Sequence, residues 1–210
     1  MLDNRFRPYV SPVLDQLGRL IARSGISANH VTVTSFAVGM AAALAIAMQA
    51  YGIGLVLLLV SRLGDGLDGA VARATQKTDF GGYLDIVLDF AFYGAIPLGF
   101  VFADVNANAV AGAVLLLSFY VNGASFLAFA IMMEKNGISD NDPGSKSLFF
   151  STGLAEATET YAVFVAACLF PAWFPLLAYG FALLCFYTAL SRIMQARRVL
   201  TQNRNENSKP

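Results

Sequence analysis

The sequence predicts an all-α protein that crosses a membrane with six helices and carries an amphipathic helix before the first of them. Of its 210 residues, 57% are hydrophobic and only 13% are charged, which is about half the charged share of a soluble domain. The apolar residues are also gathered into runs of about 20, the length that crosses a bilayer. We expect one membrane domain over residues 1–200 and a disordered polar tail over 201–210.

The first expected element is a short helix over about residues 12–23. Its apolar residues recur at helical spacing after Pro12, which is typical of a helix lying in the membrane surface. The alternative is a helix that packs as in a soluble protein. Because the N-terminus lacks the apolar core of a secretory signal peptide, we expect the first span to direct insertion.

Long charge-free runs, and runs whose charges are confined to one end, predict the first four spans. These spans are expected at 31–50, 55–74, 80–103 and within 105–133. Gly52 and Gly54 indicate the turn between the first two. Charges occupy only residues 62–73 of the second span, largely its second half, and only the first half of the third. In an antiparallel pair these halves lie at the same end.

The last two spans follow from a long uncharged stretch with one interruption. No charged residue occurs from Thr160 to Ser191, but the segment FPAWFP occupies 170–175. Proline disrupts helix interiors, so we expect a turn there, with spans at 148–169 and 174–197. The aromatic residues of this turn suit the membrane–water interface.

The distribution of basic residues predicts the orientation. Six spans place both termini on one side, and the three turns of the other side, near 51–53, 104–108 and 170–174, contain no Lys or Arg. All 14 basic residues then lie on or near the side of the termini, which the positive-inside rule makes cytoplasmic. Five or seven spans would put basic residues on both sides.

Four aspartates near the expected cytoplasmic end predict a metal site. Asp65 and Asp68 are three residues apart and Asp85 and Asp89 are four apart, so each pair shares a helix face. Carboxylates facing one another at membrane depth repel unless a cation binds. Carboxylate oxygens without nearby Cys or His favour Mg²⁺, Mn²⁺ or Ca²⁺, and two ions could share these ligands.

Small residues beside the aspartates leave room for a ligand. Gly69 and Gly81 favour close approach of a bulky ligand, whereas Gly66, Ala70 and Gly82 fit ligand access and tight helix packing equally. A metal site with such space predicts phosphoryl or phosphate-ester chemistry. The net charge is zero and does not suggest a nucleic-acid partner.

The aspartates belong to a longer pattern, D-x-x-D-G-x-x-A-R followed by G-x-x-x-D-x-x-x-D. This pattern resembles the signature of the CDP-alcohol phosphotransferases, and the spans and surface helix make the resemblance cover most of the chain. The eight matching residues are Asp65, Asp68, Gly69, Ala72, Arg73, Gly81, Asp85 and Asp89.

One spacing departs from the family. Eight residues usually separate the arginine from the second glycine, whereas residues 74–80 number seven. Gly82 would restore eight, but the fourth residue after it is Ile86 and not an aspartate. We therefore keep Gly81 and infer a shortened loop.

The resemblance implies a reaction in which an alcohol attacks the phosphate of a CDP-linked donor, commonly CDP-diacylglycerol, and releases CMP. It implies two Mg²⁺ or Mn²⁺ ions bound by the four aspartates, with Asp89 also the general base. The nucleotide site would be lined by Gly69, Ala72, Arg73 and Gly81. A homodimer in the bacterial inner membrane, with a cytoplasmic active site, is also implied. From spacing alone, Arg73 fits a phosphate ligand and a positive-inside anchor equally.

Weaker matches extend this site. Asn29 and Thr32 lie in a stretch similar to the family's entry into the first span, although the usual proline is missing. They would contact the nucleotide, or Ser27 or Asn29 would cap the helix.

The start of the fifth span offers further polar residues. Glu156 and Glu159 lie on nearly one face, where carboxylates are functional candidates, and would bind the acceptor's hydroxyls or pair with an arginine. Lys146 would bind a phosphate or be a solvated loop charge.

Two other functions use the same residues. A divalent-cation channel or transporter would need polar residues continuing across the membrane, but residues 55–61 of the second span and 90–103 of the third contain no charge. A scaffold without catalysis would not need the eight signature residues. The acceptor alcohol stays open among glycerol 3-phosphate, inositol phosphate, serine and others.

Overall fold

A computed structural model describes residues 3–137, 155 and 157–206, and within them every secondary-structure element is helical. The helices are α1 (Asp3–Arg23), α2 (Ala28–Ala47), α3 (Tyr51–Ala74), α4 (Asp79–Ala103), α5 (Val105–Lys135), α7 (Ala157–Leu169), the 3₁₀ turn η1 (Pro171–Trp173) and α8 (Phe174–Glu206).

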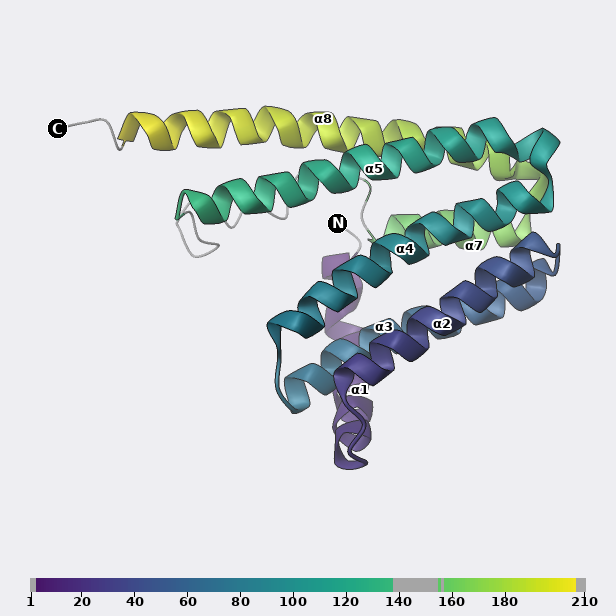
Figure 1. The fold of residues 1–210 in the computed structure, drawn as a ribbon, viewed down its shortest axis with the longest axis horizontal. Coiled ribbons are helices and arrows are strands. Elements are labelled where there is room, and N and C mark those ends of the chain that lie inside the picture. The colour runs from purple at the N-terminus through teal and green to yellow at the C-terminus, as the bar shows by residue number, and fades with distance from the viewer. Residues whose placement is uncertain (1–2, 138–154, 156, 207–210) are drawn as a thin grey trace.

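Six of the helices form a bundle. Figure 1 shows α2, α3, α4, α5, α7 and α8 running back and forth, with the α2–α3, α4–α5 and α7–α8 turns at the same end. Helix α2 packs against α3 and α4, α5 packs against α4 and α8, and α7 packs against α3 and α8. Helix α1 packs against α3.

Four helices of the described residues are long and apolar enough to cross a membrane. They are Ala28–Ala47, Asp79–Ala103, Val105–Lys135 and the continuous segment Pro171–Thr201. Helix α7 is apolar but has 13 residues. Helix α3 has 24 residues, and its charged residues, which build the site, lie between residues 62 and 73.

The turn between α2 and α3 lies before the predicted glycines. It occupies residues 48–50, where Gln49 has a φ of 61° and donates from Nε2 to the Ala103 carbonyl at 2.8 Å. The prediction of a turn at Gly52 and Gly54 was therefore wrong, since both lie inside α3. A Cβ at Gly54 would come within 2.6 Å of Ile46, so this glycine lets α2 and α3 approach.

The C-terminal helix is longer than predicted. Helix α8 continues to Glu206, past the expected end of the last span at residue 197 and through part of the tail predicted to be disordered. With 33 residues and a rise of about 1.5 Å per residue, α8 is longer than a bilayer core is thick.

Side-chain caps fix three helix starts at the ends of the bundle. Ser27 caps α2 by accepting from the His30 amide, which agrees with the capping alternative for this residue. Thr78 Oγ1 accepts from the Gly81 amide at 3.0 Å and begins α4. Asp104 caps α5 in the same way.

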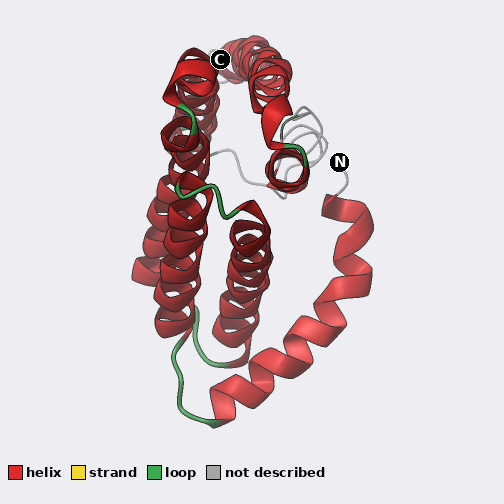
Figure 2. Ribbon diagram, turned by 90° about the vertical axis from the view of Figure 1, so that its right-hand side faces the viewer, coloured by secondary structure: helices red, strands yellow, loops and turns green. Residues whose placement is uncertain are grey.

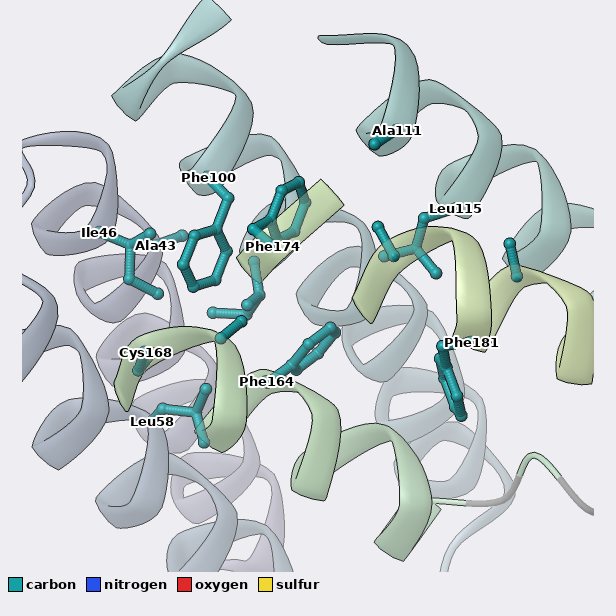
Figure 3. Packing of buried hydrophobic residues seen from close by; sticks show 14 of the residues in the cluster. Ala43, Ile46, Leu58, Phe100, Ala111, Leu115, Phe164, Cys168, Phe174 and Phe181 are labelled. Atoms are coloured by element: carbon teal, nitrogen blue, oxygen red, sulfur yellow. The ribbon is translucent and has the colours of Figure 1, made fainter. Parts of the chain in front are cut away.

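Aromatic side chains fill the centre of the bundle. The rings of Phe100 and Phe174 are stacked with centroids 4.7 Å apart, and Phe164 is fully buried beside them (Figure 3). These residues come from α4, α8 and α7. These aromatic contacts therefore join the two halves of the chain.

A polar contact joins α5 to α8. The Arg192 guanidinium donates to the Asn122 carbonyl and to its Oδ1, each at 3.0 Å, and to Ser125 Oγ at 2.7 Å. Asn122 and Ser125 of α5 therefore make interhelical hydrogen bonds with Arg192 of α8.

Helix α1 crosses the bundle, and in Figure 2 it runs across the view while the other helices are seen nearly end on. It approaches α3 at Gly18, where a Cβ would lie 2.7 Å from the Ala70 methyl. Val13, Leu17 and Leu20 are exposed and share one helix face. This exposed face is what a helix lying on a membrane surface would present.

Candidate active site

Three of the four predicted aspartates converge where α3 meets α4. One carboxylate oxygen each from Asp65, Asp68 and Asp85 lies within 4.8 Å of the others. Asp68 is buried, and among the described residues its Oδ2 has no hydrogen-bond partner. A cluster of acidic oxygens with an unsatisfied buried acceptor fits a hard divalent cation.

The fourth aspartate has a different environment. Asp89 lies one turn beyond Asp85 on α4, and its Oδ1 accepts a hydrogen bond from Arg62 Nη1 at 2.9 Å. The same nitrogen is 3.6 Å from Asp65 Oδ2. Arg62 therefore stands between Asp89 and the three converging carboxylates.

Arg62 is held by three further groups. Its Nη1 also donates to the Tyr161 hydroxyl at 3.1 Å and its Nη2 to Ser61 Oγ at 3.2 Å. Its guanidinium carbon lies 3.8 Å from the centroid of the Phe92 ring. The Tyr161 hydroxyl is also 2.8 Å from that of Tyr93.

Our interpretation of the sequence did not include Arg62. The signal was present, because an ionisable residue inside a span is a functional candidate by default. Arg62 precedes Asp65 by one helical turn, which places it on the aspartate face of α3. Within the second span, the predicted roles belong only to the charged residues of the family pattern, which are Asp65, Asp68 and Arg73.

The signature arginine contacts α1. Arg73 donates from Nη2 and Nε to Asp15 Oδ1, at 2.8 and 3.2 Å. Its Nη1 lies near Gly69, since a Cβ on that glycine would be 3.4 Å from it. Ala72 is half-buried beside Arg73. The structure therefore links α1 to the predicted nucleotide site.

Residues at the start of α2 lie beside the aspartates. A Cβ at Gly81 would be 3.0 Å from Asn29 Oδ1 and 2.9 Å from Thr78 Oγ1. Thr32 donates to the Ala28 carbonyl at 3.0 Å and lies beside the Asp68 carboxylate. Asn29 and Thr32 are therefore at the same end of the bundle as the acidic cluster.

The remaining predicted residues are only partly described. Lys146 and Glu156 lie outside the described residues. Glu159 is half-buried in the first turn of α7, two residues before Tyr161. The structure thus places one of the three on a helix that reaches Arg62.

Comparison with known proteins agrees with this arrangement. The model of the CDP-alcohol phosphatidyltransferase family matches residues 26–193. The chain is 44% identical to the inner membrane protein YnjF of Escherichia coli over 193 residues, covering 92% of this chain and 94% of that protein. It is 28% identical to archaetidylinositol phosphate synthase of Pyrococcus horikoshii over 198 residues, covering 94% and 97%.

Solved structures share the fold. The phosphatidylinositol phosphate synthase of Mycobacterium tuberculosis, in complex with manganese and citrate, aligns with a TM-score of 0.65 over 87% of this chain and 88% of that chain. The same enzyme with CDP-DAG bound aligns with a TM-score of 0.59 over 88% and 92%. Sequence identity is 20% in both cases, so this likeness concerns the fold. The family match and the YnjF relationship confirm the resemblance: the chain belongs to the CDP-alcohol phosphatidyltransferase family.

Proposed function

We propose that this protein transfers a phosphatidyl group from CDP-diacylglycerol to a small polar alcohol and releases CMP in phospholipid biosynthesis. The observation that carries this proposal is the convergence of Asp65, Asp68 and Asp85, with Asp89 one turn away, inside the family signature. A related fold has been solved with CDP-DAG bound, which supports a CDP-linked lipid as the donor.

The acidic cluster would hold two Mg²⁺ or Mn²⁺ ions. Asp65, Asp68 and Asp85 would be shared between the ions, and Asp89 would contribute a further ligand. The unsatisfied Asp68 Oδ2 and the all-oxygen donor set fit these hard ions. When bound, the ions would supply charge neutralisation to the diphosphate and to the departing CMP. The manganese in the related structure supports this assignment.

The chain's own side chains would bind the donor and move the proton. Gly69, Ala72, Arg73 and Gly81 would accommodate the cytidine diphosphate, together with Asn29 and Thr32. Asp89 would take the proton of the acceptor hydroxyl. The acceptor oxygen then forms a bond to the phosphorus of the lipid phosphate, and the bond from that phosphorus to the CMP oxygen breaks.

We further propose that α3 and α7 also cross the membrane, giving six spans. Both helices run alongside the four apolar ones (Figure 1), and the turns at residues 48–50, 104 and 170–173 contain no basic residue. The opposite end, which carries the aspartates, would face the cytoplasm of a bacterium. A homodimer is expected from the family.

The names of the relatives guide the choice of acceptor. Two archaeal relatives are archaetidylinositol phosphate synthases, so inositol phosphate is the first acceptor to test. Glu159 on α7, together with Lys146 and Glu156, would contact the acceptor.

The test is an acceptor screen with purified protein. CDP-diacylglycerol and Mg²⁺ or Mn²⁺ are supplied with inositol phosphate, glycerol 3-phosphate, serine or buffer, and CMP and lipid products are followed by mass spectrometry. We expect CMP release that requires one acceptor and is abolished by EDTA. If none of the acceptors gives CMP release with either Mg²⁺ or Mn²⁺, the protein does not catalyse this transfer.

A further inference from the structure

We propose that Arg62 is a positioning residue for the transfer reaction: it holds one oxygen of Asp89 and leaves the other to take the acceptor's proton. The proposal rests on the function proposed above. Arg62 is outside the eight signature residues. Among the residues that the structure describes, its guanidinium bridges Asp89 and Asp65 of the acidic cluster.

The hydrogen bond to Asp89 involves a single carboxylate oxygen. Arg62 Nη1 donates to Oδ1 at 2.9 Å, and charge-assisted bonds of this length are among the stronger ones in proteins. Fixing Oδ1 sets the orientation of the carboxylate plane. A general base must lie within hydrogen-bond reach of the proton it takes, so this orientation decides whether Oδ2 faces the acceptor.

The guanidinium itself has little freedom to move. Its nitrogens donate to Ser61 Oγ and to the Tyr161 hydroxyl, and the plane lies over the Phe92 ring. These groups come from α3, α7 and α4 respectively. The Arg62 side chain is only 10% exposed, so solvent competes weakly for its donors. A cation held from three helices can orient Asp89 before any substrate binds.

The position of Arg62 also separates two kinds of carboxylate. Its Nη1 is 3.6 Å from Asp65 Oδ2, and the attraction to both Asp65 and Asp89 offsets the repulsion between these two carboxylates. Asp89 is thereby drawn toward the guanidinium, while the oxygens of Asp65, Asp68 and Asp85 stay together. This arrangement suits Asp89 to proton transfer in addition to its contribution to the metal site.

The test compares Arg62→Gln, Arg62→Lys and the control Arg19→Gln, which removes an exposed arginine of α1. We expect Arg62→Gln to lower kcat about 100-fold, the low end of what general-base catalysis contributes, with the KM for CDP-diacylglycerol changed less than about threefold. Arg62→Lys retains charge but not the planar set of donors and should recover part of kcat. Arg19→Gln should behave as wild type.

A metal-binding measurement gives a result that a purely structural role would not give. Titration of Mn²⁺ into each variant by calorimetry should show tighter binding to Arg62→Gln, because a positive charge beside Asp65 has been removed. If Arg62 only stabilises the fold, its loss should instead weaken Mn²⁺ binding, raise the donor KM and lower Tm together.

A double-mutant cycle with Asp89→Asn completes the experiment. Since Arg62 acts through Asp89, we expect Arg62→Gln to have little further effect on the residual kcat of Asp89→Asn. An equal fold-loss in both backgrounds, or a wild-type kcat in Arg62→Gln, would overturn the proposal. A wild-type protein that releases no CMP with any acceptor would instead reject the proposed function, and the Mn²⁺ titration would still decide between a positioning and a structural Arg62.

Discussion

The ring of Phe92 on α4 packs directly against the backbone of Gly39 on α2. A Cβ at Gly39 would lie 2.6 Å from Phe92 Cδ2 and 2.8 Å from Ser61 Oγ, both closer than real atoms approach. Phe92 and Ser61 are also contacts of the Arg62 guanidinium. Helix α2 therefore packs against two of the side chains that hold Arg62, and Ser61 Oγ also donates to the Ser35 carbonyl of α2 at 2.8 Å.

This contact predicts that Gly39→Ala is harmful. The added methyl must displace Phe92 or Ser61, which we expect to cost about 1–3 kcal/mol of stability and to lower kcat by moving Arg62. The matched control is Gly180→Ala on α8, where a Cβ meets nothing within 4 Å. Thermal unfolding in detergent and CMP release would be compared, and equal behaviour of the two variants would show that the Gly39 contact relaxes without cost.

The different surroundings of Asp89 and Asp68 predict separable effects. Asp89→Asn should lower kcat at least about 100-fold while Mn²⁺ binding persists, because Asp65, Asp68 and Asp85 still converge. Asp68→Asn should lose both Mn²⁺ binding and activity. Calorimetric titration alongside CMP release measures the two properties. Loss of Mn²⁺ binding in Asp89→Asn would place that residue among the essential ligands.

Much of the fold could be predicted because hydropathy and charge are local properties of the chain. The expected spans at 80–103 and within 105–133 agree closely with α4 and α5. The interruption at 170–175 is the turn η1. The spacing of the aspartates also indicated their shared face, since helix periodicity fixes which residues lie together.

What could not be predicted depends on contacts between distant residues. Gln49, in the turn after α2, has a positive φ, and its side chain donates a hydrogen bond to the carbonyl of Ala103, 54 residues away. No local sequence pattern predicts that turn. Arg62 is one arginine among apolar residues in sequence, and its role follows from Asp89 and Tyr161, which lie 27 and 99 residues away. Tertiary packing alone brings these groups together.

The ion pair between Asp15 and Arg73 predicts an effect of α1 on donor binding. Asp15 occupies Arg73 Nε and Nη2, while Nη1 faces Gly69, so the pair orients the guanidinium toward the nucleotide site. Because both side chains are more than a third exposed, we expect Asp15→Asn to raise the donor KM only about two- to fivefold, as for exposed pairs of up to about 1 kcal/mol, with kcat unchanged. A lower donor KM in this variant would mean that Asp15 competes with the phosphates instead.

Adjacent glycines at the start of α4 test which of them belongs to the signature. The family's usual spacing would select Gly82, whereas the spacing to Asp85 and Asp89 selects Gly81. A Cβ at Gly81 would contact Thr78 Oγ1 and Asn29 Oδ1, but a Cβ at Gly82 would meet nothing within 4 Å. The contacts therefore favour Gly81 as the residue that must stay small.

We accordingly expect Gly81→Ala to impair the enzyme and Gly82→Ala to leave it near wild type. The methyl at position 81 pushes against the Thr78 hydroxyl that caps α4 and against Asn29, and loss of such a cap costs about 1 kcal/mol. Because Gly81 also lines the proposed nucleotide site, the KM for CDP-diacylglycerol should rise, as measured by CMP release at varied donor concentration. If Gly82→Ala impaired the enzyme more than Gly81→Ala, Gly82 would be the signature glycine and the inference of a shortened loop would be wrong. The comparison is matched, because both substitutions add one methyl group within the same helical turn.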